Sequence, residues 1–176
     1  MRARLTSLAV AGALVAGIAA PATEALAGSH ARTAPPRCLS SGLAVWVEKP
    51  AGNAALGSRY YFLRFTNLSG HPCTLRGAPG VSAVSLAGRQ LGPAAGRTTS
   101  GATTQTLAKG ATATALLKIG VAALFQGCRP RLAAGLRVFP PGDTAARVVP
   151  FPLQTCSRAS VMSVGPVGPS MELEIP

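Results

Sequence analysis

Tyr60-Tyr61-Phe62-Leu63-Arg64-Phe65 is the stretch of sequence that decides the fold. Aromatic residues favour strands, and apolar side chains at both odd and even positions suit an extended chain that is buried on both faces. The stretch therefore predicts a central strand of a β-sheet. Asn67-Leu68-Ser69-Gly70 follows it, and residues of these types commonly turn the chain.

Short apolar runs separated by Gly, Pro and Asn turns continue on both sides of this strand. Besides 59–66, we expect strands at 43–48, 73–76, 81–86, 102–107, 111–119, 133–139, 146–151 and 159–164. About 8–9 short strands at such spacings are typical of an all-β sandwich or barrel. No segment keeps a helical period over three turns, although 120–127 can form one short helical turn. Residues 92–101 are rich in Gly, Thr and Ser and are expected to form a mobile loop.

The first part of the chain, residues 1–27, has the organisation of a signal peptide. Arg2 and Arg4 supply positive charge, residues 8–20 are an uncharged apolar core, and Ala25-Leu26-Ala27 offers small residues to a signal peptidase. We expect cleavage after this tripeptide and a secreted, extracellular protein.

A membrane anchor is the alternative interpretation of the apolar segment. A spanning helix needs about 20 apolar residues, and Pro21 and Glu24 interrupt the run before that length. We therefore expect no membrane span in the mature form. The expected organisation is a signal peptide at 1–27, a flexible leader at 28–37, a β-sandwich domain at 38–168 and a C-terminal tail at 169–176.

The chain has four cysteines, Cys38, Cys73, Cys128 and Cys156. An even number of cysteines in an exported protein predicts disulfides, here two, for which three connectivities exist. Zinc is the rival interpretation, but zinc sites use closely spaced cysteine pairs, which this chain lacks.

The predicted strands favour one of these connectivities. If the strands 43–48 and 59–66 form an antiparallel hairpin, Cys38 and Cys73 both lie at its open end. Cys128 and Cys156 bracket the next pair of long strands near the end of the chain in the same way. The order of the strands therefore predicts the disulfides Cys38–Cys73 and Cys128–Cys156.

The charge balance is strongly basic. The full sequence carries a formal net charge of +12, and loss of the signal peptide, with two Arg and one Glu, leaves +11. Such a surface favours anionic partners, while the absence of a basic run argues against specific nucleic-acid binding. A soluble basic protein with no charged ligand is the alternative. The candidate anion-binding residues are Arg76, Arg89, Arg97, Arg129 and Arg131.

Groups able to carry out acid, base or nucleophilic chemistry are scarce. Within the predicted domain only His71, Glu48 and Asp143 qualify, and His71 and Asp143 have the surroundings of exposed turn residues. The cysteines are assigned to disulfides, and no phosphate-binding loop or His-Glu-x-x-His motif occurs. We expect no enzyme and no bound cofactor, with an unrecognised hydrolase as an alternative.

A second alternative depends on the cleavage site. Cutting after residue 27 would place Gly28-Ser29-His30 at the new N-terminus. A free amine, two amide nitrogens and an imidazole form the square-planar nitrogen set that Cu(II) and Ni(II) prefer. The competing interpretation is a loose leader in which the histidine has no role.

Three aromatic residues have two interpretations. Trp46, Tyr60 and Tyr61 could form a platform for sugars, but their positions within strong strand patterns favour packing in the core. Asn67-Leu68-Ser69 matches the glycosylation pattern, and the turn interpretation of that segment is preferred.

Several motifs together resemble a secreted actinobacterial family known as domain of unknown function 4232. The resemblance spans residues 38–168, and Lys109 stands where family members have Pro before Gly, which a turn accommodates equally. The motifs are Asn67…Pro72-Cys73-Thr74-Leu75, Gly77-Ala78-Pro79-Gly80-Val81, Gly88…Leu91-Gly92, Leu107…Gly110-Ala111-Thr112-Ala113, Cys128-Arg129-Pro130 and Cys156. The resemblance implies an immunoglobulin-like β-sandwich with paired cysteines, and it brings no catalytic residues to this chain.

Taken together, these features predict a secreted, non-catalytic binding or structural module of the cell envelope or extracellular space. The expected partner is an anionic envelope polymer or an envelope protein.

Overall fold

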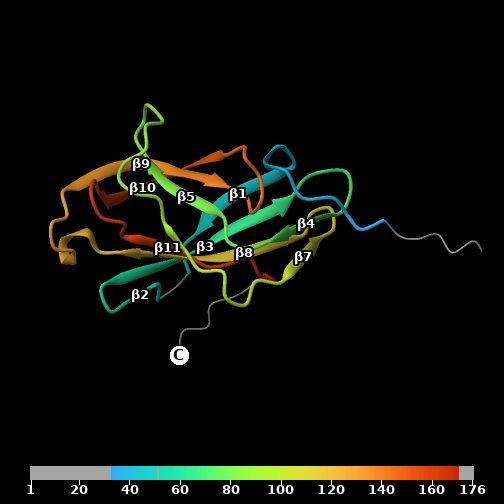
Figure 1. Ribbon diagram of the computed structural model, residues 1–176, viewed down its shortest axis with the longest axis horizontal. Coiled ribbons are helices and arrows are strands. Elements are labelled where there is room, and N and C mark those ends of the chain that lie inside the picture. The colour runs from blue at the N-terminus through green and yellow to red at the C-terminus, as the bar shows by residue number, and fades with distance from the viewer. Residues whose placement is uncertain (1–32, 51, 171–176) are drawn as a thin grey trace, which may run out of the picture. The chain divides into compact units, whose positions relative to one another are not determined.

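The computed structural model describes residues 33–50 and 52–170 (Figure 1). The expected signal peptide, the candidate metal-binding tripeptide Gly28-Ser29-His30 and the end of the C-terminal tail lie outside the described residues. Within these described residues, the chain from Ala34 onward forms one compact unit.

The described chain is all-β, as the sequence predicts. Each of the nine expected strands is present, and two additional short strands, β2 and β6, were not expected. The strands are β1 (Leu43–Glu48), β2 (Ala54–Ala55), β3 (Ser58–Asn67), β4 (Cys73–Arg76), β5 (Gly80–Val84), β6 (Gly96–Arg97), β7 (Thr104–Leu107), β8 (Thr112–Gly120), β9 (Pro130–Phe139), β10 (Arg147–Cys156) and β11 (Met162–Val164).

The helical structure in the described residues is limited to two 3-10 turns, η1 (Ser40–Gly42) and η2 (Ala122–Leu124). The second turn lies within the segment 120–127, where the sequence predicted one short helical turn. No helix in the described part of the chain is long and apolar enough to cross a membrane.

The largest sheet has six strands, in the order β1-β3-β8-β11-β6, with β2 paired to β3 (Figure 1). β3 lies between β1 and β8 and contains the stretch Tyr60–Phe65, so the predicted central strand is confirmed. Tyr61, Leu63 and Phe65 point into the core, whereas Phe62 and Arg64 are buried on the other face.

The second sheet has three strands in the order β10-β9-β5, and β4 pairs with β7 in a separate two-stranded ladder. β1 pairs antiparallel with β3, and β9 pairs antiparallel with β10. Both hairpins on which the disulfide prediction depends are therefore present.

The six-stranded and three-stranded sheets share one hydrophobic core. Leu63, Phe65 and Leu117 enter it from the larger sheet, and Leu136 and Val138 enter it from the smaller one. All five side chains are fully buried. Full burial of such side chains contributes about 1.5–3 kcal/mol each, so this shared core dominates the stability of the fold.

Residues 91–98, here named the strap, join the two sheets along one side. The backbone N–H groups of Leu91 and Ala95 donate to the carbonyl oxygens of Ala83 and Val81 on β5, at 2.9 and 2.8 Å. At its other end the strap forms β6, which pairs parallel with β11 of the larger sheet.

The strap corrects one sequence-based expectation. Residues 92–101 were expected to form a mobile loop, but the part that includes Gly96 and Arg97 is a strand. The strap is bonded to both sheets through its backbone N–H and C=O groups. Backbone hydrogen bonds of this kind cannot be predicted from side chains such as those of Gly, Thr and Ser.

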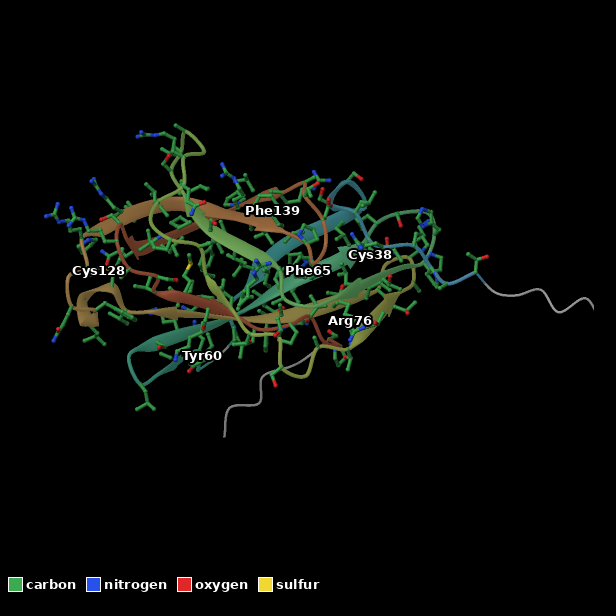
Figure 2. The ribbon with its side chains drawn as sticks, in the orientation of Figure 1. Cys38, Tyr60, Phe65, Arg76, Cys128 and Phe139 are labelled. Carbon is green, nitrogen blue, oxygen red and sulfur yellow. A yellow bond between two sulfur atoms is a disulfide. The ribbon has the colours of Figure 1, made fainter. Side chains whose placement is uncertain are left out.

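Both predicted disulfides are present. Cys38–Cys73 and Cys128–Cys156 have Cα–Cα distances of 4.9 and 5.1 Å. Figure 2 places them at opposite ends of the domain, with Cys38 near the start of β4 and Cys128 before β9. The structure therefore selects one connectivity from the three that four cysteines allow.

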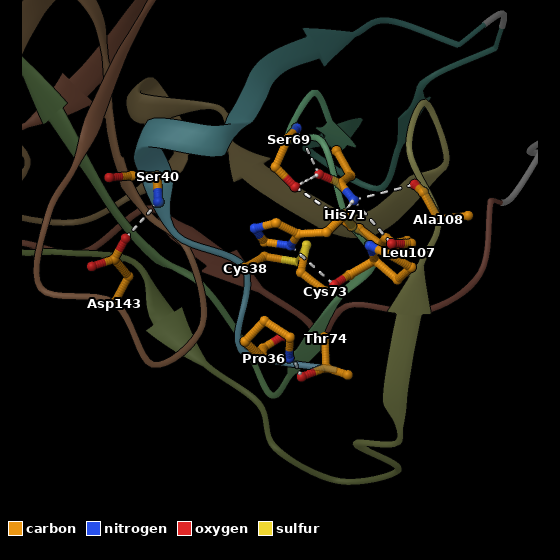
Figure 3. The surroundings of a disulfide bond; sticks show 12 residues. Pro36, Cys38, Ser40, Ser69, His71, Cys73, Thr74, Leu107, Ala108 and Asp143 are labelled. Atoms are coloured by element: carbon orange, nitrogen blue, oxygen red, sulfur yellow. Dashed lines mark hydrogen bonds between the residues drawn. A yellow bond between two sulfur atoms is a disulfide. The ribbon is translucent and has the colours of Figure 1, made fainter. Parts of the chain in front are cut away.

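The region around Cys38 extends the ordered chain into the expected leader (Figure 3). Pro36 accepts a 2.8 Å hydrogen bond from the Thr74 N–H, and the Cys38 N–H donates to the Thr74 carbonyl at 2.9 Å. Arg37 forms a β-bridge with Thr74. Residues 36–38 are thereby paired to β4 next to the first disulfide.

Candidate functional site

The three candidate acid-base residues are separated from one another. Asp143 and His71 line different pockets at the Cys38 end of the domain. Glu48 lies on β1, where its Oε2 accepts a 2.8 Å hydrogen bond from Arg64 Nε. The described chain therefore does not bring these three side chains into one cleft.

Asp143 is occupied by a structural role. Its Oδ2 accepts a 2.6 Å hydrogen bond from the Ser40 N–H, and its Oδ1 accepts one of 3.0 Å from the Ala145 N–H. The backbone N–H groups of Ala145 and Ser40 hold the pKa of the Asp143 carboxyl below its usual value. The expected turn role of Asp143 is confirmed, with an added contact to η1.

His71 is an exposed turn residue, as the sequence indicated. Figure 3 places it beside the Cys38–Cys73 disulfide, where its Nδ1 lies 3.3 Å from the Pro72 carbonyl oxygen. Among the described residues, no cluster of three or more His, Cys, Asp or Glu side chains is arranged to hold a metal ion.

Asn67 has a structural role in the same region. It is fully buried, and its Nδ2 donates to the carbonyl oxygens of His71 and Leu107 at 3.0 and 2.9 Å. Its Oδ1 accepts a 2.9 Å hydrogen bond from the Ser69 N–H. A glycan on Nδ2 would displace these contacts, so the turn interpretation is the one that fits the fold.

The sequence analysis did not identify the role of Arg64. Its side chain is 8 % exposed on the outer face of the larger sheet, where it bonds Glu48, Thr114 Oγ1 at 3.0 Å and Ser170 Oγ at 3.0 Å. The guanidinium also lies 4.9 Å from the Phe62 ring centre. A single charge inside the apolar stretch 60–65 was the signal that could have indicated a buried arginine with a charged partner.

The aromatic residues divide between core and surface. Tyr61 is buried and contacts Phe151 edge-on at 4.9 Å between ring centres, as expected for core packing. Trp46 is 43 % exposed, so core packing was the wrong expectation for it. The side chain lies on the outer face of β1, a strand at the edge of the larger sheet, opposite Arg64.

The five candidate anion-binding arginines do not form one group. Arg76 ends β4 at the Cys38 end of the domain (Figure 2). Arg97 lines a pocket of about 530 Å³ that is also lined by Asp143. Arg89 lies on the loop between β5 and the strap. Arg129 and Arg131 lie together at the opposite end, beside Cys128.

We name that last region the basic end: Arg59, Arg129, Arg131 and Arg158. All four are exposed. The Arg129 carbonyl accepts a 3.1 Å hydrogen bond from the Ser157 N–H, which brings the residue before Arg158 next to Arg129.

Arg59 joins the basic end from the larger sheet, where it pairs with Ile119 on β8. It lines a pocket of about 290 Å³ together with Val121 and with Gln154 of β10. The sequence analysis did not include Arg59 and Arg158 among its candidates. Arg158 follows Cys156 by two residues, so the predicted disulfide already linked it to Cys128, whereas Arg59 reaches this end only through the pairing of β3 with β8.

The two carboxylates of the described chain lie outside the basic end. Glu48 is paired with Arg64, and Asp143 is bound to η1 at the other end of the domain. Arg64–Glu48 is the ion pair within the described residues, and it includes no member of the basic end. Positive charge that is not neutralised by neighbouring carboxylates attracts anions.

The family model for domain of unknown function 4232 matches residues 38–168. The chain belongs to this family. The matched segment of the DUF4232 domain begins at Cys38 of the first disulfide and ends at Gly168, which bonds Thr114 of β8 through 2.8 and 3.0 Å backbone hydrogen bonds. No curated protein and no solved structure matches the chain.

Proposed function

We propose that this DUF4232 protein is a secreted, non-catalytic binding module that engages an anionic component of the cell envelope through the basic end. The observation that carries the proposal is the group of four exposed arginines at one end of the domain, with the described carboxylates bound elsewhere. Guanidinium groups bind phosphates and carboxylates through paired hydrogen bonds.

Secretion is supported by the signal-peptide pattern of residues 1–27 and by the two disulfides, which form in oxidising compartments. A two-sheet core is compatible with an immunoglobulin-like sandwich, and we propose that class for the domain. Glu48 and Asp143 are held in structural hydrogen bonds, which supports a role without catalysis.

A salt-dependent pull-down on isolated cell envelopes tests this function. The doubly substituted Arg129→Ala/Arg131→Ala protein should bind at least about tenfold more weakly than the unmodified protein, because two charge-assisted contacts are lost. Binding of the unmodified protein should fall as salt rises, since salt screens exposed charges within about 10 Å at 0.1 M.

The matched control is Arg76→Ala/Arg97→Ala, which removes the same charge from exposed positions outside the basic end. It should bind nearly as well as the unmodified protein. Equal losses in both double variants would mean that net charge alone governs binding, and binding that is insensitive to salt would remove the proposal.

A further inference from the structure

Large apolar side chains are exposed beside the basic end. Of the ten exposed large hydrophobic residues in the described part of the chain, five gather there. They are Leu56, Val121, Leu124, Phe125 and Leu132, which we name the apolar tip. The other five are distributed over separate elements, as single exposed apolar residues commonly are.

The apolar tip is held in place by close backbone packing. The Val121 N–H donates a 2.9 Å hydrogen bond to the Gly57 carbonyl, which fixes η2 against the turn after Leu56. A Cβ at Gly57 would lie 2.6 Å from Leu124 Cδ1, so Leu124 lies directly on that turn. The Phe125 ring packs on Gly120 at the end of β8 in the same close manner.

Arginines of the basic end alternate with these apolar residues. The Cys128 N–H donates a 3.2 Å hydrogen bond to the Phe125 carbonyl, so Arg129 follows the tip directly. Leu132 is 76 % exposed and follows Arg131 in β9, so the two side chains lie on opposite faces of that strand at the basic end. Apolar side chains and guanidinium groups therefore lie at the same end of the domain.

This combination matches the chemistry of an anionic lipid surface. Apolar side chains enter the boundary between headgroups and acyl chains to a depth of about 5–10 Å, while basic groups bind the lipid phosphates. A soluble polyanion would use the arginines but would leave the apolar tip in water. A surface that has an anionic layer and an apolar layer accommodates both the charge of the basic end and the exposed side chains of the tip.

We infer that the apolar tip and the basic end together dock on an anionic lipid bilayer. The inference rests on the proposed function, because it names the anionic component that the basic end engages. The arginines attract the surface, and Leu124 with its neighbours enters it.

Vesicle co-sedimentation with protein purified from culture medium tests the docking. The probes are vesicles of phosphatidylcholine alone and vesicles that also contain phosphatidylglycerol. Binding should require phosphatidylglycerol. Leu124→Ser should lower the partition coefficient about tenfold, since one leucine is withdrawn from the apolar layer. Leu68→Ser is the matched control, because Leu68 is 64 % exposed and Leu124 is 67 % exposed.

A second pair of variants tests the contribution of the basic end to vesicle binding. Arg131→Ala should weaken vesicle binding roughly fivefold, because one basic residue near an anionic surface contributes about 1 kcal/mol. Arg76→Ala removes the same charge at the opposite end of the domain and should leave binding unchanged. Equal effects of the two substitutions would contradict docking through the basic end.

Insertion has a direct spectroscopic signature. A Leu124→Trp variant in a Trp46→Phe background carries a single tryptophan at the tip, since the chain has one natural Trp. Its emission should shift to the blue on vesicle binding and be quenched by brominated acyl chains. Bound protein without a blue shift would overturn the inference.

A parallel arm with a soluble anionic polymer separates the two proposals. Salt-sensitive, Arg131-dependent binding to the polymer without binding to vesicles would overturn the lipid inference and leave the proposed function standing. Failure to bind either probe would count against both.

Discussion

Gly92 of the strap lies against the backbone of Cys156: a Cβ on Gly92 would lie 2.0 Å from the Cys156 carbonyl oxygen. The backbone of Gly92 also has a φ of +75°, a left-handed conformation that favours glycine. Both features restrict the position to glycine. The strap is therefore packed directly on the strand that carries the second disulfide.

Gly92→Ala should destabilise the domain by more than the cost of placing alanine in a left-handed backbone conformation. The matched control is Gly101→Ala, since Gly101 has a φ of +74° and open space around it. The control should cost about 1–2 kcal/mol, and Gly92→Ala should cost at least about 2 kcal/mol more because of the clash with Cys156. Urea unfolding measures both, and equal costs would show that the contact is unimportant.

Removal of either disulfide should lower the free energy of unfolding by about 3–4 kcal/mol in the chain-entropy model. The two closures span 35 and 28 residues, so the double alanine variants at Cys38/Cys73 and at Cys128/Cys156 should lose similar amounts. Denaturant unfolding of each variant checks the expectation. A large difference between the two would indicate that local packing, rather than loop closure, determines their contributions.

The strand pattern was predictable because the sequence carries it directly. Tyr60–Phe65 is apolar on both faces, which indicated the central strand, and each cysteine pair brackets one hairpin, which indicated the connectivity. β6 was missed because Gly96 and Arg97 have no strand-like side chains. Its pairing comes from backbone groups of β11, whose position only the folded chain defines.

Asn67→Asp should be strongly destabilising although the two side chains have nearly the same shape. Nδ2 of Asn67 donates to the carbonyl oxygens of His71 and Leu107, and a carboxylate would place negative charge against both. The cost should be about 3 kcal/mol or more at neutral pH. Thermal unfolding compares the variant with the unmodified protein, and a loss below about 0.5 kcal/mol would contradict the buried donor role.

Asp143→Asn should remove a pH-dependent part of the stability. The pKa of Asp143 is lowered in the folded state, so the carboxylate contributes stability above its ordinary pKa of about 3.9, and this contribution is lost as the pH falls through the lower folded value. The difference between the unmodified protein and the variant should be largest at neutral pH and disappear in acid. Because Asp143 is partly exposed, it should stay below about 1 kcal/mol.

The pH series for this variant pair uses chemical unfolding at several pH values. A difference that grows as the solution becomes more acidic would have the wrong sign, and would mean that the hydrogen bonds from Ser40 and Ala145 do not favour the ionised carboxyl.

The basic end was only partly predictable from sequence. Arg129 and Arg131 are neighbours of Cys128 in the chain, and this closeness survives folding. Arg59 comes from a distant segment, and no local pattern links it to Cys128. Arg158 lies two residues after Cys156, so the expected disulfide could have indicated it. For Trp46 the sequence predicted burial, but the side chain is exposed. A strand pattern does not reveal which face of an edge strand is exposed to solvent.

The strap should slow the separation of the two sheets. Its amides are bonded to β5 on one sheet, and the Thr98 N–H donates a 3.0 Å bond to the Val164 carbonyl on the other, so neither sheet can move away while the strap is in place. Hydrogen exchange at the Ala95 amide should therefore be as slow as at the centre of β3, despite the surface position of the segment. Fast exchange there would mean that the two sheets are joined by their side chains alone.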